Sequence, residues 1–145
     1  MAEIFPDEGL DYILAIFPKN GANIATLYAG LFSSQTATTV PGRTMVLATS
    51  TGITEVAGTG YARVSLAAAT WGAISTVGSG RQSTYPQITF PTVGSGGWTT
   101  ANGFFIATAS AAGTCIYAAN FDGLTARVFL VNDIEKLTPT IQYDG

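Results

Sequence analysis

Charged residues are scarce in this sequence and histidine is absent. Only 10% of the 145 residues are Asp, Glu, Lys or Arg, compared with about 25% in an ordinary soluble domain. Without histidine the chain can form no Ser-His or Cys-His nucleophile pair, and most metal sites lose a common ligand. A G-x-S-x-G motif is also absent. We therefore expect no enzyme, and no catalytic, cofactor-binding or metal-binding site.

The sequence also lacks features that are typical of nucleic-acid-binding, membrane-spanning and disulfide-bonded proteins. The six Lys and Arg residues lie far apart in sequence, whereas nucleic-acid-binding proteins usually carry clustered basic residues. No apolar run approaches the ~18–20 residues that a membrane-spanning helix needs. The single cysteine, Cys115, excludes an internal disulfide. We expect a protein that is made in a reducing cytoplasm and binds neither nucleic acid nor membranes.

The first twenty residues predict one short helix. Apolar residues recur there at helical spacing, at Leu10, Ile13, Leu14 and Phe17. Asp7 can cap this helix, and Pro18 ends it. A helix of about three turns is marginal by itself, so its apolar stripe must pack either on the core of its own domain or on a neighbouring subunit. The four stripe residues are therefore candidate interface residues.

After residue 21 the apolar period changes to two, which indicates strands. Residues 33–52 contain a Pro-Gly turn and predict a long loop. The predicted strands cover residues 24–32, 61–71, Gln87–Phe90, Phe104–Thr108, Cys115–Ala119, Ala126–Val131 and Lys136–Tyr143. Short strands separated by Gly-rich turns predict a mainly β fold, an antiparallel, jelly-roll-like β-sandwich. We expect a single domain, in which the helical segment 1–20 packs on the sandwich of residues 21–145.

A few polar and aromatic residues are candidates for a site. Cys115 alternates with apolar neighbours, which favours a buried, inert thiol. Asp122-Gly123 and Asn132-Asp133 are typical of hairpin turns, although these carboxylates and Glu135 could instead form a catalytic pair or hold a cation. Trp98 is a candidate interface residue, because core or interface anchoring is more common for such a residue than sugar stacking.

The order of several segments resembles a known family. The segments are "ATLYAGLF" at 25–32, "EVAGTGYARVSLAAATWG" at 55–72, "ITFPTV" at 88–93, "GGWTTANGFFIATASAAGTCIYAANF" at 96–121 and "DIEKLTPTIQYDG" at 133–145. Together they resemble small tailed-phage virion proteins described as head decoration or tail-fibre-like proteins. The resemblance implies a β-sandwich protein of the virion.

Two functions follow from this resemblance. The first is a capsid decoration or cement protein on the head exterior, which is synthesised in the host cytoplasm, binds the major capsid protein and associates with itself, with a trimer expected. A weakly charged surface suits coverage by other subunits. The alternative is a tail-tip or fibre-associated module that binds a host surface receptor. An exposed Trp98 would favour the receptor-binding function, and a buried Trp98 the cement function.

Overall fold

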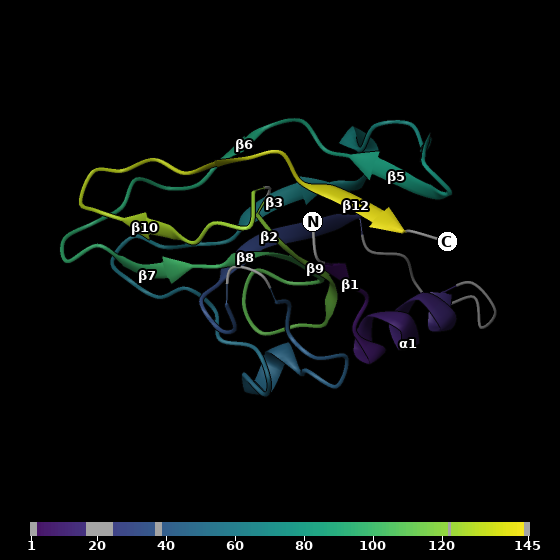
Figure 1. Ribbon diagram of the computed structural model, residues 1–145, viewed down its shortest axis with the longest axis horizontal. Coiled ribbons are helices and arrows are strands. Elements are labelled where there is room, and N and C mark those ends of the chain that lie inside the picture. Colours follow the sequence, from purple (N-terminus) through teal and green to yellow (C-terminus); the bar gives the residue numbers. More distant parts are fainter. Residues whose placement is uncertain (1–2, 17–24, 37–38, 122, 144–145) are drawn as a thin grey trace.

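The chain is built around one five-stranded antiparallel sheet (Figure 1). The computed structural model describes residues 3–16, 25–36, 39–121 and 123–143. The order of strands in the central sheet is β1 (Glu3–Ile4), β9 (Cys115–Asn120), β8 (Gly103–Ala107), β2 (Thr26–Phe32) and β3 (Val64–Ala67). Each neighbouring pair in this sheet is antiparallel.

Three smaller antiparallel sheets complete the described strands. They are β10 (Arg127–Phe129) with β7 (Trp98–Ala101), β11 (Lys136–Leu137) with β6 (Ile88–Thr89), and β12 (Thr140–Tyr143) with β5 (Gly80–Thr84) and β4 (Ser75–Val77). The predicted mainly β, antiparallel fold with one short α-helix is confirmed for the described residues. The layer facing the central sheet is divided into these small sheets, since Pro86, Pro91 and Pro139 lie beside their strands and cannot donate backbone hydrogen bonds.

Strands β8 and β9 are buried along their whole length. Their side chains alternate between two cores, so that Phe104 and Ile106 enter the first core and Phe105 enters the second. A strand covered on both faces needs apolar residues at every position. This explains why "GFFIA" and "CIYAA" are nearly continuous apolar runs.

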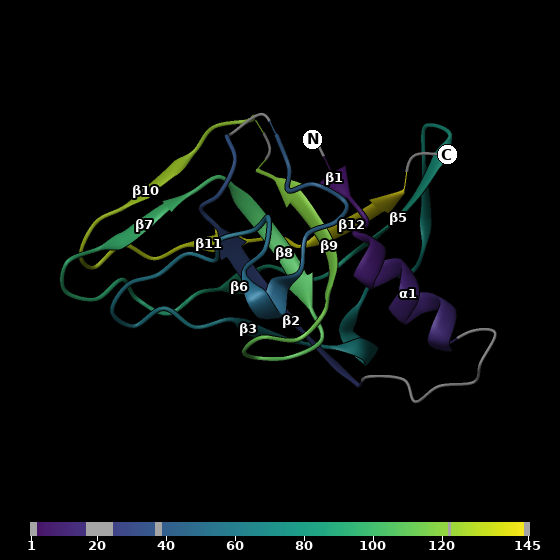
Figure 2. The same ribbon diagram turned by 90° about the horizontal axis from the view of Figure 1, so that it is seen from below.

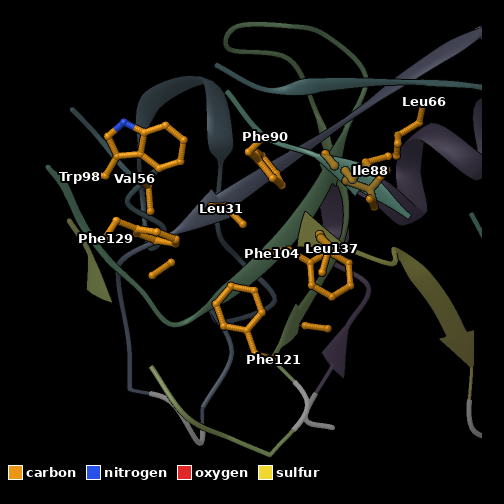
Figure 3. Packing of buried hydrophobic residues seen from close by; sticks show 14 of the residues in the cluster. Leu31, Val56, Leu66, Ile88, Phe90, Trp98, Phe104, Phe121, Phe129 and Leu137 are labelled. Carbon is orange, nitrogen blue, oxygen red and sulfur yellow. The ribbon is translucent and has the colours of Figure 1, made fainter. Parts of the chain in front are cut away.

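The first core lies between the central sheet and the smaller sheets (Figure 3). At one end Trp98 packs against Phe129, with ring centroids 5.4 Å apart. Phe104, Phe121 and Leu137 form another group in this core (Figure 3). Six of the sixteen buried residues of this core are aromatic, which suits a small domain because each ring buries a large apolar area.

The second core is covered by the 33–52 loop. That loop is largely irregular, as predicted, but it contains the 3₁₀ turn η1 (Leu47–Thr49). It also buries Met45 and Leu47 against Phe32 and Phe105. The loop therefore functions as a packing layer, which its Thr- and Ser-rich sequence did not indicate.

Two buried asparagine side chains hold the beginning of this loop. The Asn102 amide donates to the carbonyl oxygens of Ser33, at 3.1 Å, and Gln35, at 2.9 Å. The Asn120 amide donates to the carbonyl oxygen of Thr39 at 2.9 Å. These bonds satisfy loop carbonyl groups where no strand pairs with them.

Helix α1 (Asp7–Ile16) docks beside β9 (Figure 2). The Glu8 carboxylate accepts hydrogen bonds from the backbone N–H of Cys115 at 2.7 Å and of Leu47 at 3.3 Å. A Cβ at Gly9 would lie 2.7 Å from the Ile116 carbonyl oxygen, so glycine allows the close approach. Because Leu10 N–H donates to the Pro6 carbonyl, Pro6 occupies the capping position that we predicted for Asp7.

The strand predicted over residues 61–71 is shorter than expected. Strand β3 begins at Val64 and ends at Ala67, and the 3₁₀ turn η2 (Ala68–Thr70) follows it. Tyr61 and Arg63 instead join a polar network through Glu55. The predicted strand Lys136–Tyr143 is likewise divided into β11 and β12 around Thr138 and Pro139.

Candidate binding surface

The candidate binding surface is the segment of residues 127–138, which comprises β10, a turn and β11. Phe129 and Leu137 anchor this 127–138 segment in the first core. Four large apolar side chains of the same segment are exposed, and we call them the apolar edge: Val128, Leu130, Val131 and Ile134. Scattered exposed apolar residues are normal, but four on one short segment are typical of an interaction surface.

The backbone of the apolar edge is fixed by hydrogen bonds. The Asp133 N–H donates to the Leu130 carbonyl at 3.0 Å, and the Asp133 carboxylate accepts from the Leu130 N–H at 2.7 Å. Asn132 adopts a φ of 70° and donates its N–H to the Val93 carbonyl. The predicted turn at Asn132-Asp133 is thus confirmed, but it is not a hairpin turn, because β10 and β11 belong to different sheets. A fixed backbone lowers the entropy that a partner would have to remove on binding.

Strand β10 also presents a strand edge. In the part of the chain that the structure describes, β10 pairs with β7 alone. Strands β7 and β10 lie at one end of the long axis and α1 at the other (Figures 1 and 2). The apolar edge therefore lies far from the helix that we had considered as an interface.

A small pocket is lined in part by the 127–138 segment. Its volume is about 220 Å³. The lining residues come from five separate parts of the chain and are Gln87, Phe104, Phe121, Arg127, Lys136, Leu137 and Thr138. Two of the six Lys and Arg residues of this acidic protein therefore converge on one cavity.

The Arg127 guanidinium is held in one orientation beside the pocket. Its central carbon lies 3.9 Å from the centroid of the Phe121 ring, which is a close cation–π contact. Arg127 also forms an ion pair with Glu135, whose side chain is mostly buried. Glu135 therefore has a structural partner, and its carboxylate serves to position Arg127.

Of the predicted interface residues, Trp98 lies in the core. Its side chain is 6% exposed, and its indole N–H donates to the Thr59 carbonyl at 2.9 Å. Leu10 is partly buried on α1. The side chains of Ile13 and Leu14, and the whole of Phe17, lie outside the described residues. The structure does not bring Trp98 and Leu10 together, since they belong to elements at opposite ends of the molecule (Figure 1).

The 127–138 segment was not predicted as a site from the sequence. The signal that could have found it is the run "VFLVNDI" at 128–134, where apolar residues continue through a predicted turn. A turn at the surface usually carries polar residues. Val131 and Ile134, which flank this turn, are both exposed.

The described residues include one buried thiol. Cys115 is fully buried, as predicted. Burial raises the pKa of its thiol, and the nearby Glu8 charge raises it further. Among the described residues no three His, Cys, Asp or Glu side chains cluster as metal ligands. Asp122 lies outside the described residues. No described helix has the length and hydropathy needed to cross a membrane.

A comparison with protein families gives a match over most of the chain. Residues 19–139, more than four fifths of the sequence, match the family described as podophage GP4 fiber I protein gp80. The chain belongs to this family. A comparison with curated proteins gave no match.

Membership in the gp80 family makes the protein a structural component of a tailed-phage virion. It confirms the resemblance to tailed-phage virion proteins that the sequence segments indicated. The description of the family as a fibre protein fits the fibre-associated alternative better than a decoration protein of the head.

Proposed function

We propose that the protein is a fibre-associated subunit of a podophage virion that contacts the surface of the host cell. The observation that carries this proposal is the match to a fibre protein family over residues 19–139. The low charge of the chain supports it as well, because surfaces that become covered in an assembly need few charged side chains.

The buried Trp98 does not argue against this proposal. We had expected burial of Trp98 to favour a capsid cement function. However, its indole packs against Tyr61 at a centroid distance of 5.2 Å and against Phe129, so its burial is explained by the core alone. Trp98 is therefore no receptor contact, and its burial does not distinguish a head protein from a fibre protein.

In the proposal, the apolar edge attaches the subunit to its neighbour in the fibre. It is fixed, exposed and at one end of the molecule (Figure 1). Interfaces of standard size bury about 800 Å² on each partner, so the four side chains would form the centre of a larger contact. The neighbour is either another copy of this chain, as in the trimer that we predicted, or a different virion protein.

Fractionated virions test the proposal. Heads and tail structures are separated and the protein is quantified in each by gel densitometry. Particles lacking the protein are then assayed for adsorption to host cells and for genome release on heating. We expect the protein in the fibre-containing fraction, reduced adsorption and an unchanged release temperature. A head location with many copies, together with release at a lower temperature, would establish the cement function instead.

A matched pair of variants tests the apolar edge. Val128 and Ile74 are equally exposed, at 67% and 68%, so an aspartate at either position leaves the isolated fold intact. When added back to particles lacking the protein, Val128→Asp should fail to incorporate, whereas Ile74→Asp should incorporate like the unmodified protein. Equal incorporation of both variants would exclude the apolar edge as the attachment surface.

A further inference from the structure

The chemistry of the pocket beside β11 is that of an anion-binding site with an apolar wall. Lys136 offers three hydrogen-bond donors and no acceptor, while Gln87 and Thr138 offer an amide and a hydroxyl group. Phe104 and Leu137 form an apolar wall. The pocket thus combines donors for an oxygen-rich, negatively charged group with a surface suited to C–H groups.

Charge distinguishes this pocket from the rest of the protein. The chain has a net charge of −3, so its average field repels anions. At the pocket, the Arg127 charge is matched by Glu135, and Lys136 adds a further positive charge. A carboxylate at this position would therefore be attracted locally, although the molecule as a whole is acidic.

The size of the pocket limits what it can hold. Its volume of about 220 Å³ is below the roughly 300–1,000 Å³ of pockets for drug-sized ligands. One sugar unit suits a pocket of this volume, whereas a long oligosaccharide would extend out of it. Repetition of the subunit on a virion would strengthen weak binding at each single site.

We propose that this pocket binds the carboxylate of one acidic sugar unit in a host-surface polysaccharide, an inference that rests on the proposed contact with the host. Lys136 pairs with the carboxylate, Gln87 and Thr138 bind ring hydroxyl groups, and the sugar's apolar face lies against Leu137. The Arg127 guanidinium lies beside this group on the Phe121 ring, and its charge is matched by Glu135.

Titration of the purified protein with sodium glucuronate, followed by NMR chemical shifts, tests this proposal. Glucose and sodium acetate serve as the neutral-sugar and simple-carboxylate controls, and inorganic phosphate as a different anion. We expect glucuronate alone to saturate shifts at residues 121, 127 and 136–138. Saturation by acetate or phosphate at similar concentrations would show a general anion site and overturn the proposal, as would the absence of any glucuronate shift.

Two variants and a control assign the binding to this pocket. Lys136→Ala should weaken glucuronate binding about tenfold or more, as expected for a charge-assisted hydrogen bond, and Thr138→Val should weaken it less. Arg81→Ala removes an exposed cation on β5 and should leave binding unchanged. Unchanged binding in Lys136→Ala, or an equal loss in Arg81→Ala, would overturn the proposal. Thermal melts verify that each variant is folded.

Failure of the acidic-sugar site and failure of the proposed contact with the host give different results. If virions lacking the protein adsorb poorly but the purified protein does not bind glucuronate, contact with the host stands and the acidic-sugar site is wrong. If the protein binds glucuronate but its removal leaves adsorption unchanged, the site stands and the proposed function is wrong.

Discussion

Replacing Arg63 with methionine should lower the free energy of unfolding by about 3 kcal/mol. The Arg63 side chain is 3% exposed and forms a bidentate pair with Glu55, at 2.8 and 2.7 Å. It also donates to the carbonyl oxygens of Ala109 and Ala112 and lies 5.0 Å from the Phe105 ring centroid. One guanidinium thus joins Glu55, the β8–β9 connection and the second core.

The magnitude follows from what the substitution leaves behind. Breaking a buried ion pair on one side costs about 3–5 kcal/mol, because the remaining charge loses its partner. Glu55 is 28% exposed, so water can partly solvate it, and the Ala112 carbonyl is at the surface. Methionine retains much of the apolar contact with Phe105. Because of these compensations, we expect the free energy of unfolding to fall by an amount at the lower end of that range, about 3 kcal/mol.

Urea denaturation followed by tryptophan fluorescence measures this loss, because buried Trp98 becomes solvated on unfolding. Arg43→Met is the matched control. Arg43 pairs with Asp7 at 2.9 Å, but the two side chains are 63% and 52% exposed, so the control should cost about 0–1 kcal/mol. Adding Glu55→Gln to Arg63→Met should cost less than the sum of the single changes. If Arg63→Met is as stable as the control, the network does not stabilise the fold.

Two further predictions concern the buried strands. Burial raises the pKa of Cys115, so above pH ~8.5 the thiol loses its proton in the unfolded state but keeps it in the folded state. The contribution of this thiol to the free energy of unfolding is therefore fully present below that pH. Above that pH the free energy of unfolding falls by up to about 1.4 kcal/mol per pH unit. Urea denaturation between about pH 9 and 10 should show this slope in the native sequence but not in Cys115→Ala, and equal slopes would contradict the assignment. In β2, a Cβ at Gly30 would lie 2.3 Å from the Phe105 ring, so Gly30→Ala should cost about 1–3 kcal/mol. Gly42→Ala, where the added Cβ meets nothing within 4 Å, is the control in the same denaturation assay, and an equal cost would refute the close packing.

Features of the fold that depend on neighbours in sequence could be predicted. The apolar runs of β8 and β9 predicted buried strands, the alternation around Cys115 predicted its burial, and Asn132-Asp133 predicted a turn. The helix beginning at Asp7 followed from spacing and from Pro18. Each of these signals lies within about ten residues, and local backbone preference and apolar period act over that range.

The candidate site depended on contacts between distant residues. Phe104, Phe121 and Lys136 form one pocket only because β8, β9 and β11 come together in the fold. The burial of Trp98 was likewise decided by Tyr61 and Phe129, which pack on it from other strands. A sequence period says which residues share a face of a strand, but it does not say which face is covered. That choice belongs to the pairing of distant strands. The sequence alone located four of the five strands of the central sheet, whereas the tertiary structure decided the bounds of the strands and the surface they present.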